Sequence, residues 1–139
     1  GSTSSEVAKR LALSRELVTE KVEQRRLDDY FPQINHLRTL IKVDTEGNEL
    51  SVLRGAARTL QAAKPMIIFE CWHDTQRAEL FEFLNSQDYQ IYHLPWNPVK
   101  EAPPLALDQF LGASSTNFIA VPALDWMVSH KEEYDFPRE

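Results

Sequence analysis

The sequence predicts an α/β fold in which helices connect the strands of one sheet. Short apolar runs alternate with segments of helical spacing, in the order strand, helix, strand, helix, strand, loop, strand. This order is typical of a sheet with parallel crossovers, because two parallel strands need a long connection that is usually a helix. Strands this apolar are usually covered from both sides, so we expect helices on both faces of the sheet.

Four runs are expected as strands because β-branched and aliphatic residues dominate them. The first two each end in an acid, at Asp44 and at Glu70. The first strand is expected to be buried on both faces except at Lys42. The expected strands cover residues 39–44, 66–70, 89–94 and 117–121.

Helices are expected between the strands, where apolar residues recur every three or four positions. The second helix is expected over residues 75–85, with Phe81 and Leu84 facing inward. A proline-bearing loop is expected over residues 95–104, followed by one or two helical turns at residues 105–111. The first helix follows the first strand with apolar residues at this spacing, namely Leu50, Leu53, Ala57 and Leu60.

The chain before the first strand is rich in charge and less regular. A helix is expected over about residues 5–17, whereas residues 18–27 fit a helix or a strand equally. Asp28 could cap a short helix that Pro32 ends.

One domain is expected, because 139 residues suit a single hydrophobic core. Gly1-Ser2 resembles the remnant of a cleaved tag, and we expect residues 1–26 to be this remnant and an N-terminal helical segment. Residues 27–122 are expected to form the α/β domain. Residues 123–139 are expected as a tail, either a short helix around Trp126 or frayed.

Composition argues against several classes of protein. A net charge of −6 argues against a nucleic-acid-binding surface. No apolar run approaches the roughly 20 residues that span a bilayer, and the first residues lack the pattern of a signal peptide. The single cysteine, Cys71, rules out an intrachain disulfide and favours a reducing compartment, so we expect a cytoplasmic protein.

Acidic side chains are expected to gather at one edge of the sheet. In open α/β sheets, ligands bind beyond the carboxyl ends of the strands. The first two strands deliver carboxylates to this edge, and a histidine and an indole follow the second. The residues expected there are Asp44, Glu46, Glu49, Glu70, Trp72, His73 and Asp74.

Most of these residues also have a structural explanation. Glu46 and Glu49 at the start of a helix are favoured by the helix dipole, and Asp44 could cap that helix. Lys42 in a buried strand is expected to pair with a carboxylate. His73 becomes a base only if a substrate reaches it. A divalent ion held by carboxylate oxygens is a minor alternative, since no dedicated metal motif is present.

Three stretches resemble the central signature of the FkbM-type methyltransferases: residues 41–50 (IKVDTEGNEL), 52–56 (VLRGA) and 64–70 (KPMIIFE). In that signature a strand ends I-K-x-D, an E-G turn and a further acid follow, a helix carries L-x-G-A, and a second strand ends in Glu. Residues 27–30 (LDDY) resemble its L-D-D element, and residues 117–122 are similar to its last strand. The resemblance therefore spans residues 27–122.

The resemblance implies O-methylation by S-adenosylmethionine, on a hydroxyl of a sugar or another small molecule. It also implies that the chain is the C-terminal half of a Rossmann-like methyltransferase sheet, strands four to seven, with flanking helices. Asp44 would contact the cofactor, and would orient or deprotonate the acceptor hydroxyl together with Glu46, Glu70 or His73. Glu49 and Trp72 would contact the substrate.

The family's glycine-rich cofactor loop has no counterpart in this sequence. Its glycines are Gly1, Gly47, Gly55 and Gly112, and none lies two residues from another. No backbone cradle for the cofactor can be drawn from them, so we expect weak or no binding of S-adenosylmethionine. A truncated enzyme, a degenerate paralogue and a fragment that pairs with another chain all remain open.

Two functions follow from these observations. The chain is either part of an O-methyltransferase, inactive on its own, or a non-catalytic module for assembly or partner binding. Without a neighbour on one side, the strand at residues 39–44 would expose an edge that invites pairing. A second copy or a missing N-terminal half could cover this edge, as could residues 5–27. We favour a homodimer.

Overall fold

The computed structural model describes residues 4–14, 18–34, 38–73, 76–100 and 102–123, so the expected tail around Trp126 lies outside the described residues. Its elements in chain order are α1 (Ser4–Ser14), the 3-10 helix η1 (Leu27–Tyr30), α2 (Phe31–Ile34), β1 (Leu40–Val43), α3 (Glu49–Arg54), α4 (Ala57–Ala63), β2 (Met66–Glu70), α5 (Arg77–Ser86), β3 (Tyr89–His93), α6 (Leu107–Gly112) and β4 (Asn117–Pro122). None of the described helices is long and apolar enough to cross a membrane.

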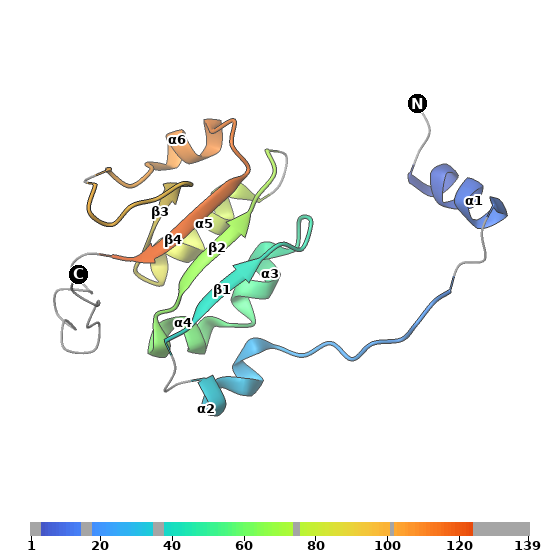
Figure 1. Cartoon of the computed structure of the whole chain (residues 1–139), viewed down its shortest axis with the longest axis horizontal. Coiled ribbons are helices and arrows are strands. Elements are labelled where there is room, and N and C mark those ends of the chain that lie inside the picture. Colours follow the sequence, from blue (N-terminus) through green and yellow to red (C-terminus); the bar gives the residue numbers. More distant parts are fainter. Residues whose placement is uncertain (1–3, 15–17, 35–37, 74–75, 101, 124–139) are drawn as a thin grey trace.

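The four strands form one sheet in the order β1-β2-β4-β3 (Figure 1). β1 and β2 are parallel, as expected, whereas β4 is antiparallel to both of its neighbours. The expectation of parallel crossovers throughout is therefore wrong for the last strand. β4 is buried from Phe118 to Pro122 and occupies an inner position, where strands on both sides satisfy its backbone.

The hydrophobic core lies between one face of this sheet and helices α3 to α6. Side chains alternate between the faces, and those of Val43, Phe69, Phe118 and Ile91 belong to the core. Helices α3, α4 and α5 lie behind the sheet in Figure 1, and α6 packs against α5. The other face carries no described helix, so the expectation of helices on both faces is not met in the described part of the chain.

β1 is one of the two edge strands of the described sheet, and its burial differs from the expected pattern. Leu40 is 60% exposed and Lys42 is exposed, whereas Val43 alone is buried. The expectation of a strand buried on both faces except at Lys42 is therefore wrong. The reason is that no strand of the described residues pairs with β1 on the side away from β2.

Residues 18–26 form neither the helix nor the strand that their pattern allows. All of them are exposed, with Val18 at 92% and Val22 at 84%. They lead away from the sheet to α1, which lies apart from it (Figure 1). This part of the N-terminal segment therefore leaves the β1 edge uncovered.

The single helix expected after β1 is two helices, α3 and α4, with a break at Gly55. The carbonyl of Gly55 accepts a hydrogen bond from the backbone N–H of Asp28, at 3.1 Å. A β-carbon at Gly55 would lie 3.5 Å from the β-carbon of Arg26, so the chain before η1 passes close to the break. The contact with an upstream segment explains why the apolar spacing alone did not reveal two helices.

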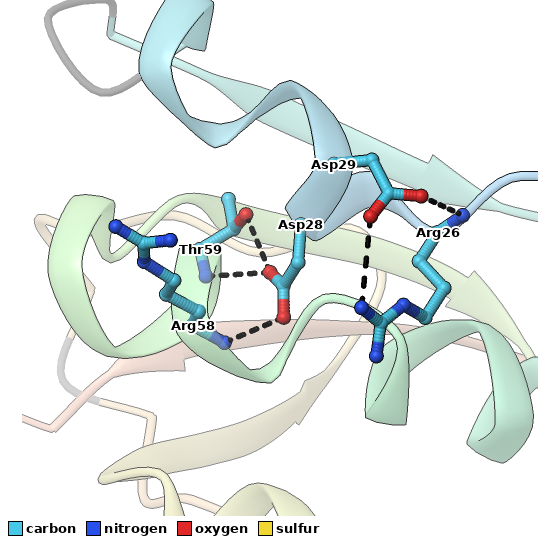
Figure 2. A network of polar contacts seen from close by, with 5 residues as sticks. All are labelled: Arg26, Asp28, Asp29, Arg58 and Thr59. Carbon is cyan, nitrogen blue, oxygen red and sulfur yellow. Dashed lines mark hydrogen bonds and ion pairs between the residues drawn. The ribbon is translucent and has the colours of Figure 1, made fainter.

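Asp28 caps α4, which begins 29 residues later, and not the short helix beside it. Its carboxylate accepts hydrogen bonds from the backbone N–H of Arg58 at 3.1 Å and from that of Thr59 at 2.9 Å (Figure 2). The Thr59 hydroxyl donates a further bond at 2.9 Å. The expected local cap is therefore wrong, and Pro32 lies inside the first turn of α2, where proline is tolerated.

Candidate functional site

The carboxyl ends of β1 and β2 bring Asp44 and Glu70 side by side. The parallel register pairs Val43 with Phe69, so the next residue of each chain segment reaches the same edge of the sheet. A hydrogen bond between the two carboxyl groups raises the pKa of Glu70, and the negative charges of Asp44, Glu49 and Glu46 add to this effect. The expectation that Asp44 and Glu70 share one edge on neighbouring parallel strands is confirmed.

Asp44 also has a cationic neighbour. The Lys42 ammonium lies 3.7 Å from a carboxylate oxygen of Asp44, because residues two apart on a strand point to the same face. The expected pairing of Lys42 is confirmed, but both side chains are about half or more exposed, at 71% and 47%. An ion pair in such water contact stabilises the fold by less than about 1 kcal/mol.

The turn after β1 carries Glu46 in an unusual backbone conformation. Glu46 has φ 54° and Gly47 has φ 103°, both in the region that side chains rarely adopt. Glycine takes this conformation without steric cost, whereas Glu46 is strained. Other contacts must therefore hold this turn.

Glu49 makes those contacts. One of its carboxylate oxygens accepts hydrogen bonds from the Thr45 backbone N–H, the Thr45 hydroxyl and the Gly47 backbone N–H, each at 3.1 Å. Burial would raise the pKa of Glu49, but hydrogen bonds from its own backbone N–H, from the Gly47 and Thr45 N–H groups and from the Thr45 hydroxyl hold it below its ordinary value. The side chain is only 3% exposed. Its carboxylate is therefore ionised and directed at the turn.

The segment that leaves β2 carries Trp72 and His73, three residues or fewer after Glu70. The indole of Trp72 is 50% exposed, and His73 is exposed as well. The backbone of this segment is held by a hydrogen bond from the Cys71 N–H to the Thr116 carbonyl, at 2.7 Å. Asp74, which was expected at the same edge, lies outside the described residues.

Arg77 is a structural feature of this region that the sequence interpretation missed. Its side chain is 2% exposed, and its guanidinium donates to the backbone carbonyls of Cys71, Phe110 and Ala113 at 2.8 Å each and of Ser115 at 2.9 Å. It therefore ties the segment after Glu70 to α6 and to the approach of β4. A signal was present, because Arg77 shares the helical stripe of the buried Leu80 and Leu84.

Behind the turn lies a cavity of about 10 Å³, room for no more than a water molecule. It is lined by Gly47, Glu49, Leu50, Cys71, Gln76 and Leu80. Within the described ranges, no group of three or more His, Cys, Asp or Glu residues is arranged to hold a metal ion.

The described glycines do not fit the cradle that S-adenosylmethionine would need. Gly47 follows a strand, but its N–H is occupied by Glu49. Gly55 lies against the carbonyl of Val52 and the side chain of Arg26, and Gly112 has no neighbour within 4 Å of an added β-carbon. A backbone cradle needs several free N–H groups in one glycine-rich turn, which these positions do not form.

The fold and this edge define the class of protein. A mixed α/β sheet with flanking helices and carboxylates beyond two parallel strands is compatible with part of a Rossmann-like methyltransferase fold. The family described as the Methyltransferase FkbM domain matches residues 1–91 of the 139, and the chain belongs to this family.

The matched range includes the turn after β1 and ends at Ile91 in β3. It begins upstream of residue 27, where the resemblance in the sequence begins, and it stops before β4. Comparison with curated proteins gives no match, and comparison with solved structures gives none either. Membership of the family implies a methyltransferase-type function.

Proposed function

We propose that this chain supplies the acceptor side of an S-adenosylmethionine-dependent O-methyltransferase that acts on a hydroxyl of a sugar or another small molecule. The observation that carries the proposal is the placement of Asp44 and Glu70 side by side, at the carboxyl ends of the parallel strands β1 and β2 and within residues 1–91, which match the family. Carboxylates at this edge lie where open α/β sheets bind their ligands.

The pair can accept a proton from a hydroxyl group. Carboxylate oxygens accept hydrogen bonds from hydroxyl groups, and its raised pKa makes Glu70 a better proton acceptor than an ordinary glutamate. An acceptor hydroxyl bound there would pass its proton to one of these two carboxylates as its oxygen becomes nucleophilic. General bases contribute about 100- to 10,000-fold to such steps. Glu46, on the adjoining turn, and His73 are the further candidates for this role.

Trp72 supports a sugar as the acceptor. Its half-exposed indole follows Glu70 by two residues, so an apolar ring and hydrogen-bond acceptors occur at one edge of the sheet. Sugars present an apolar C–H face to an aromatic ring and hydroxyls to carboxylates. Trp72 would therefore contact the ring of the acceptor, while Asp44 and Glu70 would accept hydrogen bonds from its hydroxyl groups.

The methyl group would come from S-adenosylmethionine, for which the described residues offer no cradle. We therefore propose that the chain by itself is inactive. Calorimetric titration with S-adenosylmethionine is expected to give no dissociation constant in the low micromolar range, which would correspond to about −8 kcal/mol. A constant in that range would overturn this part of the proposal.

The acceptor site can be tested by NMR of the chain with a panel of methyl hexosides. At least one hexoside is expected to shift the carboxyl signals of Asp44 and Glu70 and the indole signal of Trp72. Asp44→Asn is expected to abolish these shifts, whereas Glu82→Gln, an exposed acid on α5, should leave them unchanged. The proposal fails if no hexoside shifts these signals, or if Asp44→Asn responds as the wild type does.

A second candidate function is a non-catalytic methyltransferase-fold module used for assembly. The uncovered edge of β1 favours it, since Leu40 is 60% exposed and residues 18–26 leave that edge open. The partner we propose is a second copy of the chain. A cytoplasmic location is part of both proposals and is supported by the single cysteine, Cys71, which cannot form an intrachain disulfide.

A further inference from the structure

We propose that Glu49 is a positioning residue, which builds the turn that presents Asp44 and Glu46 and does not itself contact the acceptor. The inference rests on the proposed function only for the purpose of the turn, which is to present Asp44 and Glu46 to an acceptor. The role of Glu49 in shaping the turn can be tested without any ligand.

The geometry gives Glu49 control of the whole turn. A single carboxylate oxygen receives two donors from Thr45 and one from Gly47, so the residues on both sides of Glu46 are anchored to the same atom. Asp44 precedes the first of these anchors directly. The hydrogen bonds from Thr45 to Glu49 therefore also fix the direction of the backbone at Asp44, at the end of β1.

The conformation of Glu46 shows why such an anchor is needed. With φ at 54°, Glu46 occupies a backbone region that is unfavourable for a residue with a β-carbon. A strained residue keeps its conformation only when its surroundings fix it. Its two neighbours are fixed by Glu49, which makes the carboxylate of Glu49 the source of that constraint.

Glu49 also acts on the acid pair through its charge. Its carboxylate is buried and ionised, and its negative charge is one of the causes that raise the pKa of Glu70. In this way one side chain shapes the turn and also helps to raise the pKa of Glu70. A residue that contacted substrate would instead need an accessible carboxylate.

Two substitutions separate the geometric effect from the charge effect. Glu49→Gln keeps an oxygen that accepts hydrogen bonds from Thr45 and Gly47 but removes the charge. Glu49→Ala removes both. Glu82→Gln removes an exposed acid from α5 and is the matched control.

The readouts are the backbone amide signals of Thr45 and Gly47 and the titration midpoint of the Glu70 carboxyl group, followed by NMR. In Glu49→Ala both amide signals are expected to move toward those of a solvent-exposed loop, and the Glu70 midpoint is expected to fall. In Glu49→Gln the amide signals should stay close to the wild type while the midpoint still falls. The control should match the wild type in both readouts.

The proposal is overturned if Glu49→Ala, with the sheet signals of Ile67 and Ala120 intact, leaves the amide signals and the midpoint unchanged. If Glu49→Ala does not fold, Glu49→Gln and Thr45→Val decide. The proposal is overturned if the Glu70 midpoint in Glu49→Gln and the Gly47 amide signal in Thr45→Val both equal those of the wild type. If the wild-type chain binds no hexoside, that result would count against the proposed function alone. The shifts expected here would remain, so the two failures can be told apart.

Discussion

At the scale of single residues, Asp28 joins two distant parts of the chain. Its carboxylate accepts hydrogen bonds from the backbone N–H groups of Arg58 and Thr59, in the first turn of α4. Ala56, the residue before α4, has no side-chain hydrogen bond that caps this helix. Replacing a capping residue by alanine costs about 0.5–2 kcal/mol. We therefore expect Asp28→Ala to lower the free energy of unfolding by about 1 kcal/mol in urea denaturation.

Asp29→Ala is the matched control for this prediction. Asp29 is exposed and, among the described residues, accepts a hydrogen bond from the Arg26 N–H at 3.2 Å and forms an exposed ion pair with the Arg26 side chain. Its loss is expected to cost less than that of Asp28. Equal losses for both variants would mean that the capping of α4 does not account for the effect.

The same cap predicts how stability depends on pH. Burial would raise the pKa of Asp28, but hydrogen bonds from Thr59 and Arg58 hold it below its ordinary value of 3.8. The contribution is therefore complete above pH 3.8 and is lost as the pH falls through the lower pKa of the folded state. The stability difference between wild type and Asp28→Ala should shrink across that interval in acid titrations.

Arg77 provides the second prediction at this scale. Its guanidinium satisfies four backbone carbonyls, so Arg77→Ala would leave buried acceptors without donors. Each such group costs about 1–3 kcal/mol, and we expect a loss of at least about 3 kcal/mol in urea denaturation. Arg58→Ala removes an exposed guanidinium that lies 4.4 Å from the ring centre of Phe31, and should cost about 1 kcal/mol or less. A loss for Arg77→Ala no larger than that would contradict the structural role.

At the scale of elements, the strands were predicted more accurately than their directions. The run at residues 66–70 coincides with β2, and the other three runs differ from their strands by one or two residues. A buried apolar run looks the same in a parallel and an antiparallel strand, so the direction of β4 had no local signal. The break at Gly55 was missed for a similar reason, because Asp28 and Arg26 impose it from upstream.

The residues that gather at the site could be predicted from the sequence, whereas the roles assigned to them stay predictions. Asp44 and Glu70 were placed correctly, since an acid at the end of each of two parallel strands must reach one edge. Glu49 was expected to contact substrate, because a carboxylate at the start of a helix has the same sequence pattern whether it faces water or its own turn. The hydrogen bonds from Thr45 and Gly47 show that Glu49 faces its own turn, and they support the positioning role proposed above.

The two turns that contain glycine give a prediction at the element scale. Gly47 has φ 103°, so Gly47→Ala is strained and is expected to cost about 1–2 kcal/mol. Gly55 has φ −70° and room for a β-carbon, so Gly55→Ala should be neutral or stabilise by about 0.4–1 kcal/mol. Thermal and urea denaturation of both variants checks this. A larger loss for Gly55→Ala than for Gly47→Ala would show that the break between α3 and α4, and not the turn after β1, is the constrained one.

At the scale of the whole molecule, the described helices of the core leave two surfaces of the sheet open. One is the face opposite α3 to α6, and the other is the outer edge of β1. The half-buried side chains of Met66, Ile68 and Tyr92 lie on that face. The edge is the more consequential, because its backbone groups can pair with any extended chain.

This open edge carries the last prediction, a homodimer in which β1 pairs with a second copy. Light scattering at micromolar concentration is expected to give a mass near twice the 16.0 kDa of the chain. Leu40→Lys adds a charge at the exposed position of the edge and should shift the mass to that of a monomer, since charge on an edge strand opposes pairing. Val99→Lys, at an 85% exposed loop position, should stay dimeric. A monomeric wild type whose amides at residues 40–43 resist exchange would instead mean that the chain covers its own edge.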